Sequence, residues 1–211
     1  MKKIFLSFII TVFVTGCSSS KYMEEIPLKI TFDETQIREY LHINNEIEET
    51  DKSDYEENLT DDQLRVKEKY SIILRVLPEE IKNYDFYLYI DKWIGTGYAS
   101  KGFTKDSLNI APFTQVLYDK AYGKSIPNTA SEIFKSDELE KFTGRDFLQE
   151  GDIIFFRYHK DNPISDLAIY LRNDKILAST KTSGLAIFSF NDPYFQTRYV
   201  ASARIKPEKE N

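Results

Sequence analysis

The spacing of hydrophobic residues changes near Gly151, and this change limits the folds that the chain can adopt. Before Gly151, apolar side chains recur three or four positions apart, as they do along one face of a helix. After Gly151, short runs of β-branched and aromatic residues are separated by turn-forming residues, which is the pattern of strands. Helices followed by strands predict the α+β class, in which N-terminal helices pack on an antiparallel β-sheet.

The first helix is predicted to begin at Thr60, because Thr60 and Gln63 can form a capping box. Pro78 is predicted to end this helix, since proline cannot continue a helical interior. The apolar residues between these positions recur at helical spacing and form the expected buried face: Val66, Tyr70, Ile73, Leu74 and Leu77.

A second helix is expected next, ending at a loop that contains Gly95 and Gly97. No G-K-[ST] sequence follows these glycines, so the loop is not a phosphate-binding loop. We expect Trp93 to point into the core together with Phe113 of the following helix. The predicted buried face of the second helix is Phe86, Ile90, Trp93 and Ile94.

A third helix is predicted with Pro112 in its first turn and Gly123 as its C-terminal cap. Thr129 and Glu132 can form another capping box, at the start of a shorter helical segment. The apolar residues that these two segments are expected to bury are Phe113, Val116, Leu117, Ala121, Ile133 and Phe134.

Five strands are predicted after Gly151, and turn-forming residues at 172–174, 183–184 and 191–193 separate several of them. Each strand is a short run rich in β-branched or aromatic residues. The predicted strands are 153–156, 167–171, 175–178, 185–190 and 199–205.

The N-terminus has the composition of a bacterial secretory signal. Lys2 and Lys3 precede an eleven-residue stretch, 4–14, with nine apolar positions, which is shorter than the roughly 20 residues of a membrane-spanning helix. The sequence V-T-G-C that follows resembles a lipobox, and this implies cleavage after residue 16 and acylation of Cys17. Ser18 rather than Asp follows the cysteine, which favours the outer membrane, facing the periplasm. The alternative is an ordinary signal peptide that contains a cysteine by chance.

An acidic segment separates this signal from the expected domain. Nine acidic residues and one basic residue lie between positions 44 and 62, and such a block repels itself and cannot bury a core. Residues between 26 and 41 are expected to form at most one short local element. The predicted organisation is therefore a signal peptide at 1–16, a flexible tether at 17–59, a folded domain at 60–206 and a polar tail at 207–211.

The composition excludes several classes of function. A net charge of −6 lacks the basic footprint of a nucleic-acid-binding protein. One cysteine and two histidines exclude a disulfide framework and a zinc site built from several Cys and His ligands. We therefore expect no nucleic-acid partner, no metal and no cofactor.

Five segments between about Asp85 and Lys206 resemble the NlpC-type papain-like cell-wall cysteine peptidases, enzymes that cut the peptide stems of peptidoglycan. The resemblance implies a papain-like fold and a place in the cell envelope. In chain order, the segments are W-I-G-T-G-Y at 93–98, F-T-Q-V-L-Y at 113–118, Q-E-G-D-I-I-F-F at 149–156, A-I-Y-L at 168–171, and the stretch from N-D-P-Y at 191–194 to Arg204.

All three catalytic positions of that family are substituted. The family's chemistry needs a cysteine at the start of the long helix, a histidine base and a second histidine that orients the base. Matching the motifs D-C-S-G-F, H-V-G-I-Y-L and F-I-H-A-S places Ile110, Asp166 and Leu177 at these positions. No catalytic residue is therefore expected, and Tyr98 and Asn109 remain as candidate cleft residues, although Tyr98 can equally be a packed aromatic.

The surroundings of these positions also depart from the family. Lys101, Ser107 and Pro112 stand where the family usually has glycine, so the groove is expected to be reshaped. Asp166 is expected to be partly buried beside Ile110 and Leu177, which would raise the pKa of its carboxyl group.

These residues predict a lipid-anchored, catalytically inactive protein that binds peptidoglycan stem peptides or an envelope protein, as a binding, scaffolding or regulatory module. The alternative is a cell-wall peptide hydrolase with a relocated nucleophile. Ser100, Thr104 or Ser107 would then need a base, and His159 is the one histidine of the expected domain. His42 lies in the tether and is expected to be structural or exposed.

Overall fold

The computed structural model describes residues 59–158, 160–161 and 163–207. The signal peptide, Cys17, the local element near 26–41 and both histidines lie outside the described residues, as does nearly all of the tether. No helix within the described ranges is long and apolar enough to cross a membrane.

Helix α2, Asp61–Leu74, begins with the predicted capping box: Thr60 Oγ1 accepts a hydrogen bond from Gln63 N, and Gln63 Oε1 accepts one from Thr60 N at 2.9 Å. The predicted end of this helix was wrong. The helix stops at Leu74, because Arg75 adopts a left-handed conformation with φ 56°. Pro78 instead opens a 3₁₀ helix, η1 (Pro78–Glu80), where its missing N–H costs nothing. Leu77 therefore lies beyond α2 and is 66% exposed.

Helix α3, Tyr84–Asp91, buries Phe86 and Ile90 as predicted. It ends before Trp93 and Ile94, so these two residues do not continue its buried face. Ile94 is exposed, and Trp93 is half-buried, with its ring 4.4 Å from that of Phe103.

Helix α4, Ile110–Tyr122, is capped by Asn109 at its start and by Gly123 at its end, where φ is 62°. Of its predicted face, Phe113 and Leu117 are buried, whereas Val116 and Ala121 are half-buried. The short helix α5, Ala130–Lys135, begins after the predicted cap, in which Thr129 Oγ1 accepts from Glu132 N at 3.3 Å.

Six antiparallel strands form one sheet in the order β3-β8-β4-β5-β6-β7. The five predicted strands are present with ends shifted by at most two residues, and β3 was not predicted. Two further elements, the parallel pair β1–β2 and helix α6, were also missed. The bounds are β1 Gly97–Tyr98, β2 Ser107–Leu108, β3 Leu139–Phe142, β4 Ile153–Phe156, β5 Asp166–Tyr170, β6 Lys175–Thr180, β7 Gly184–Ser189, α6 Pro193–Gln196 and β8 Tyr199–Ile205, with a 3₁₀ helix η2 at Arg145–Phe147.

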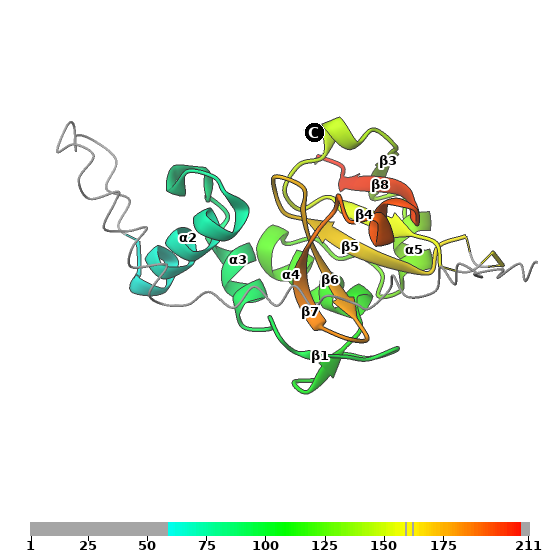
Figure 1. The fold of residues 1–211 in the computed structure, drawn as a ribbon, viewed down its shortest axis with the longest axis horizontal. Helices are drawn as coiled ribbons and strands as arrows, with labels where there is room; N and C mark the ends of the chain where they lie inside the picture. The colour runs from blue at the N-terminus through cyan, green and yellow to red at the C-terminus, as the bar shows by residue number, and fades with distance from the viewer. Residues whose placement is uncertain (1–58, 159, 162, 208–211) are drawn as a thin grey trace, which may run out of the picture.

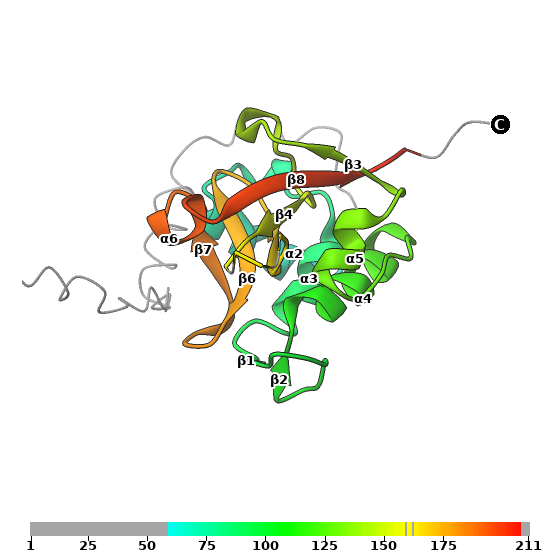
Figure 2. The ribbon, with the colours of Figure 1, turned by 90° about the vertical axis from the view of Figure 1, so that its right-hand side faces the viewer.

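The sheet carries a hydrophobic core on each face. Residues such as Phe155 and Ile169 face helices α2 to α5, whereas Phe156 and Ala168 face α6. Figure 2 shows α3, α4 and α5 on one side of the sheet and α6 on the other, and Figure 1 shows α2 and α3 beyond α4. This arrangement confirms the predicted α+β class with helices packed on an antiparallel sheet.

An ion pair between a buried aspartate and a partly exposed arginine joins the start of β4 to β8. Asp152 is 1% exposed and accepts two hydrogen bonds of 2.7 Å from Arg204 on β8, one from Nε and one from Nη2. Gln149 N donates to the same carboxylate at 2.7 Å. Its two oxygens are thus occupied by structural partners, so Asp152 holds the start of β4 to β8.

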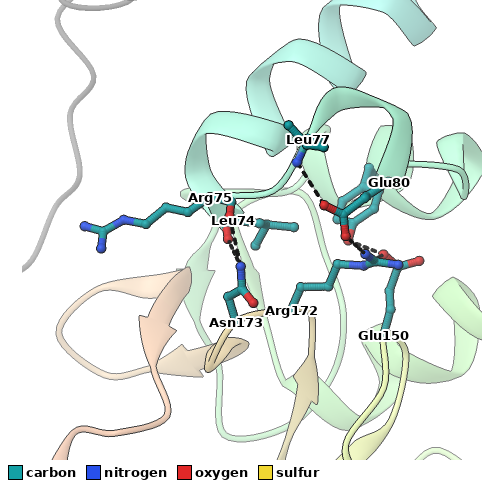
Figure 3. Close-up of polar contacts among 8 residues, drawn as sticks. Leu74, Arg75, Leu77, Glu80, Glu150, Arg172 and Asn173 are labelled. Atoms are coloured by element: carbon teal, nitrogen blue, oxygen red, sulfur yellow. Dashed lines mark hydrogen bonds and ion pairs between the residues drawn. The ribbon is translucent and has the colours of Figure 1, made fainter.

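A second polar cluster, the Arg172–Asn173 clasp, joins the turn between β5 and β6 to the first helices (Figure 3). Arg172 bridges Glu80 of η1, at 3.0 Å, and Glu150, at 3.2 Å. Asn173 Nδ2 donates to the carbonyl oxygens of Leu74 at 2.9 Å and Arg75 at 3.0 Å. The clasp therefore satisfies carbonyl groups that the end of α2 leaves without partners.

Candidate functional site

The N-terminus of α4 is held in place by Asn109. Its Oδ1 accepts a hydrogen bond from Ala111 N at 3.0 Å, and its Nδ2 donates to the Ser100 carbonyl at 3.1 Å. Its backbone N–H donates to the Gly102 carbonyl at 2.8 Å. Asn109 thus ties the preceding loop to the helix, and its polar atoms are used for structure.

Ile110 is the first residue of α4 and is 1% exposed. Its side chain belongs to the core between the helices and the sheet. A helix N-terminus can activate a thiol placed there, because its partial positive charge favours the thiolate. An aliphatic side chain at the same place offers neither a nucleophile nor a proton donor.

Asp166 is the first residue of β5 and pairs with Phe156 of β4. Its Oδ1 accepts a hydrogen bond from the adjacent Leu167 N at 2.9 Å. Burial raises the pKa of the carboxyl group to about 6, and the bond from Leu167 opposes the shift. The rise in the pKa of Asp166 was predicted, but the residues around Asp166 differ from those expected.

Leu177 lies on the opposite face of the sheet from Asp166. Side chains alternate along a strand, so Asp166 shares a face with Ala168, which belongs to the core beneath α6. Leu177 pairs with Ile169 and belongs to the core beneath the helices. Ala178 is the residue of β6 in the same core as Ala168. A side chain that oriented a base at 166 would stand on this face, and both Leu177 and Ala178 are apolar.

The start of β5 lies at the same end of the sheet as the start of α4. Strands β5 and β6 are antiparallel, so Asp166 lies near the end of β6. There, Ser179 Oγ donates to the Leu108 carbonyl at 3.2 Å, two residues before Ile110. Ile110 and Asp166, the first two of the three matched catalytic positions, therefore lie at one end of the fold, as the resemblance to the family implies.

Three tyrosines and Asp166 form a cluster at this end, which we call the Asp166 cluster: Tyr98, Tyr158, Tyr194 and Asp166. Burial and the negative charge of Asp166 raise the pKa of both Tyr98 and Tyr158. The rings of Tyr158 and Tyr194 lie 5.9 Å apart. Tyr98 was a predicted cleft residue, whereas Tyr158 and Tyr194 were not singled out by the sequence.

Arg198 covers the outer tyrosines of the cluster. Its guanidinium carbon lies 4.3 Å from the ring centroid of Tyr194 and 5.6 Å from that of Tyr158. Its Nη1 donates to the Tyr194 carbonyl at 2.7 Å and to Thr197 Oγ1 at 3.3 Å. Arg198 is therefore bound to the end of α6, and it makes no ion pair with Asp166.

The segment that carries Tyr98 is fixed against the β6–β7 turn. Leu185 N donates to the Thr96 carbonyl at 2.8 Å, and Gly95 N donates to the Leu185 carbonyl at 2.9 Å. A Cβ atom on Gly184 would lie 2.2 Å from that Thr96 oxygen, and its φ is 63°. Only glycine at 184 allows this approach, which holds the segment that carries Tyr98 in place.

The loop before α4 offers hydroxyl groups but no assembled nucleophile. Thr104 Oγ1 donates to the Ser107 carbonyl at 2.9 Å and accepts from Ser107 N at 3.2 Å, so it closes a turn. Among the described residues, neither Ser100 nor Ser107 has a hydroxyl bonded to an acidic side chain. Lys101 and Gly102 are exposed in this loop. In the same part of the chain, no three His, Cys, Asp or Glu side chains form a group that could hold a metal ion.

Two family models match the chain. Residues 95–204 match the NlpC/P60 family, and residues 1–18 match the lipid attachment site of prokaryotic membrane lipoproteins. The second match supports a lipid-anchored protein of the cell envelope, in agreement with the predicted lipobox.

Curated relatives match over the second part of the chain. A probable endopeptidase NlpC homolog of Haemophilus influenzae is 27% identical over 115 residues, which are 54% of this chain and 58% of the relative. The murein DD-endopeptidase MepS/murein LD-carboxypeptidase of Escherichia coli K12 is 27% identical over 113 residues, which are 54% of this chain and 57% of the relative. The chain thus spans little more than half the length of these relatives.

Solved structures share the fold. An NlpC/P60 family protein from Bacillus cereus superimposes with a TM-score of 0.52 and 21% identity, over 60% of this chain and 41% of that chain. A lipoprotein-like NLP/P60 family protein from Staphylococcus aureus gives a TM-score of 0.50 and 21% identity, over 75% of this chain and 46% of that chain. The family model covers more than half of the chain, and the fold agrees with it: the protein belongs to the NlpC/P60 family.

Proposed function

We propose that this protein is a lipid-anchored, non-catalytic member of its family that binds peptidoglycan stem peptides in the cell envelope. The observation that carries this proposal is the buried Ile110 at the N-terminus of α4. The family's acyl transfer needs a thiolate at that place. An isoleucine that is part of the core can neither attack a carbonyl carbon nor exchange a proton with Asp166.

The binding part of the proposal is supported by what surrounds the substituted positions. Asn109 still holds the loop to the start of α4, and Tyr98 still stands at the end of the sheet beside position 166. Relatives over the same segment are named murein endopeptidases. A site that loses its reactive groups but keeps neighbours such as Asn109 and Tyr98 is suited to holding a ligand without cutting it.

The anchor and the domain limits complete the proposal. Acylation of Cys17 and cleavage after residue 16 would leave the tether, 17–59, between the membrane and the domain at 60–206, with a polar tail at 207–211. We place the anchor in the outer membrane, with the domain in the periplasm. From there the domain can reach peptidoglycan and act as a binding, scaffolding or regulatory module.

The test is to incubate purified protein, beginning at residue 18, with muropeptides, and to measure both binding and cleavage. Calorimetry reports binding and mass spectrometry reports cleavage, with the E. coli enzyme MepS as a positive control for cleavage. We expect binding with no cleaved product from mildly acidic to mildly basic pH.

Two results would reject the proposal. Cleavage that survives repurification and disappears in Ser107→Ala or His159→Ala would instead establish a hydrolase with a relocated nucleophile. Neither binding nor cleavage would reject the peptidoglycan ligand and leave an envelope protein as the partner to search for.

A further inference from the structure

We propose that the Asp166 cluster binds a primary ammonium group, with the Asp166 carboxylate as its ion-pair partner and the phenol rings of Tyr98, Tyr158 and Tyr194 around it. The inference rests on the proposed function, because it names the chemical group by which the same cleft would hold its peptide ligand.

The first argument is the missing counter-ion of Asp166. The side chain is half-buried, and within the described residues it makes one hydrogen bond, from the adjacent Leu167 N at 2.9 Å. No Lys or Arg in those ranges lies within ion-pair distance of it. A carboxylate withdrawn from water without a cation is costly, and a cationic ligand would remove that cost.

The second argument is the aromatic surface beside the carboxylate. Tyr158 N donates to Ser165 Oγ, one residue before Asp166, at 3.2 Å. The ring of Tyr158 lies 6.4 Å from that of Phe156, which pairs with Asp166, and 5.9 Å from that of Tyr194. The charge of Asp166 also raises the pKa of Tyr98 and Tyr158. Faces of aromatic rings attract ammonium and guanidinium groups. A carboxylate beside such rings can therefore attract an organic cation in two ways, by an ion pair and by cation–π contact.

Arg198 does not fill this place. Its guanidinium already lies over the outer rings, which shows that these faces accept a cation, but its Nη1 is committed to Tyr194 O and Thr197 Oγ1. Asp166 is therefore left for a second cation. A primary ammonium is a compact charge on a flexible stem, so it needs less room beside a half-buried carboxylate than a planar guanidinium does.

Other ligand classes fit the cluster less well. An anionic group would be repelled by Asp166, and no group of described His, Cys, Asp or Glu residues could complete a metal site. A neutral sugar could stack on the tyrosines, but it would leave the carboxylate without a counter-charge. Peptide ligands with free amino groups provide that charge.

The experiment compares muropeptides that keep their free amino groups with the same muropeptides after acetylation of those groups. Binding is measured by calorimetry near pH 7.5 for the wild type, for Asp166→Asn and for a matched control, Asp119→Asn. Asp119 lies on the exposed part of α4, and its replacement removes the same charge far from the cluster. We expect acetylation to weaken binding to the wild type at least tenfold. Asp166→Asn should lose affinity to a similar extent and show no further loss on acetylation, and Asp119→Asn should behave as the wild type.

Equal affinity for free and acetylated muropeptides would overturn the ammonium site while leaving peptidoglycan binding intact. If muropeptides do not bind at all, a simple probe decides the question: n-pentylammonium, with pentanol as its neutral control, titrated while the tyrosine ring signals are followed by NMR. Shifts in the wild type with pentylammonium alone, absent in Asp166→Asn, would support the site without the proposed function. The absence of any shift would reject it.

Discussion

At position 166, where the motif match places the family's histidine, the chain has a carboxyl group whose surroundings make its charge costly. In the folded protein the pKa of Asp166 is about 6, compared with an ordinary value of 3.8. The charged form is therefore better solvated in the unfolded chain. The stability that protonation gives is fully present below the unfolded pKa and is lost as the pH rises through about 6.

Asp166→Asn should therefore stabilise the protein at pH 8, because the amide keeps the acceptor for Leu167 N and carries no charge. The expected gain is roughly 2–3 kcal/mol in the free energy of unfolding, and it should shrink toward zero as the pH falls to about 4. Urea unfolding at several pH values measures this change, with Asp119→Asn as the control that lacks it. A gain that does not vary with pH would show that the Asp166 carboxyl is not destabilised by burial.

Ile110 provides a second prediction at the scale of single residues. Since its side chain is part of the core, Ile110→Ala should cost about 2–5 kcal/mol in the free energy of unfolding, whereas Ile110→Val should cost about 0.5–1.5 kcal/mol. Chemical denaturation measures both. If Ile110→Ala were as stable as the wild type, residue 110 would not be part of the core. The argument against a catalytic role would then rest on the sequence alone.

Some residues of the candidate site could be predicted from the sequence, and others could not. Ile110, Asp166 and Tyr98 could be predicted because each lies in a motif whose spacing is continuous in the sequence. The cluster around Asp166 could not, since Tyr158 follows β4 and Tyr194 lies in α6, and the two meet only when β4, β5 and α6 are assembled. The opposite faces of Asp166 and Leu177 follow from strand register, and a shift of one residue in a motif match reverses the face.

At the scale of elements, local signals predicted helix starts and tertiary contacts set several of the ends. The cap of α2 at Thr60 and the C-terminal cap of α4 at Gly123 depend on residues within one turn. The end of α2, at the left-handed Arg75, also receives hydrogen bonds from Asn173, which is about a hundred positions later in the chain. Strand β3 was missed for the same reason: four residues, two of them charged, form a strand only because β8 lies beside them.

The Arg172–Asn173 clasp yields a prediction about α2. Asn173 has φ 46°, so Asn173→Gly keeps the backbone conformation and removes the two hydrogen bonds to Leu74 and Arg75. We expect a loss of about 1–3 kcal/mol in the free energy of unfolding. Asn173→Ala should lose about 1–2 kcal/mol more, because a Cβ atom is unfavourable in the left-handed region. Thermal unfolding compares the two with Asn128→Ala, an exposed control, and a Gly variant equal to the wild type would show that the clasp does not stabilise α2.

At the scale of the whole molecule, the α+β class and the order of helices and strands could be predicted from periodicity. The extent of the domain could not be taken from the family alone. The family match begins at residue 95, yet residues from α2 and α3, together with Ile81, belong to the same core as α4 and the sheet. The core is therefore shared between the matched segment and the helices that precede it.

The anchor gives a prediction in the cell. Cys17 follows a lipobox-like sequence within a matched lipid attachment site, and two acyl chains hold a protein stably on a membrane where one does not. The protein should incorporate labelled fatty acid and sediment with membranes, whereas Cys17→Ser should do neither. A Cys17→Ser protein that still carries label would place the modification elsewhere.

The shared core leads to a prediction about truncation. A chain that begins at residue 95 keeps the whole family match but loses the buried side chains that α2, α3 and Ile81 contribute to the core shared with α4. Burial of each is worth about 1.5–3 kcal/mol, and a natural domain is stable by only about 5–15 kcal/mol in total. The chain 95–207 should therefore show no cooperative thermal transition and no near-ultraviolet circular dichroism, whereas the chain 59–207 should melt as the longer protein does. Cooperative melting of the shorter chain at the same temperature would show that the helices before residue 95 are an appendage rather than part of the fold. The side chains lost are Val66, Tyr70, Leu74, Ile81, Phe86, Tyr87 and Ile90, all fully buried.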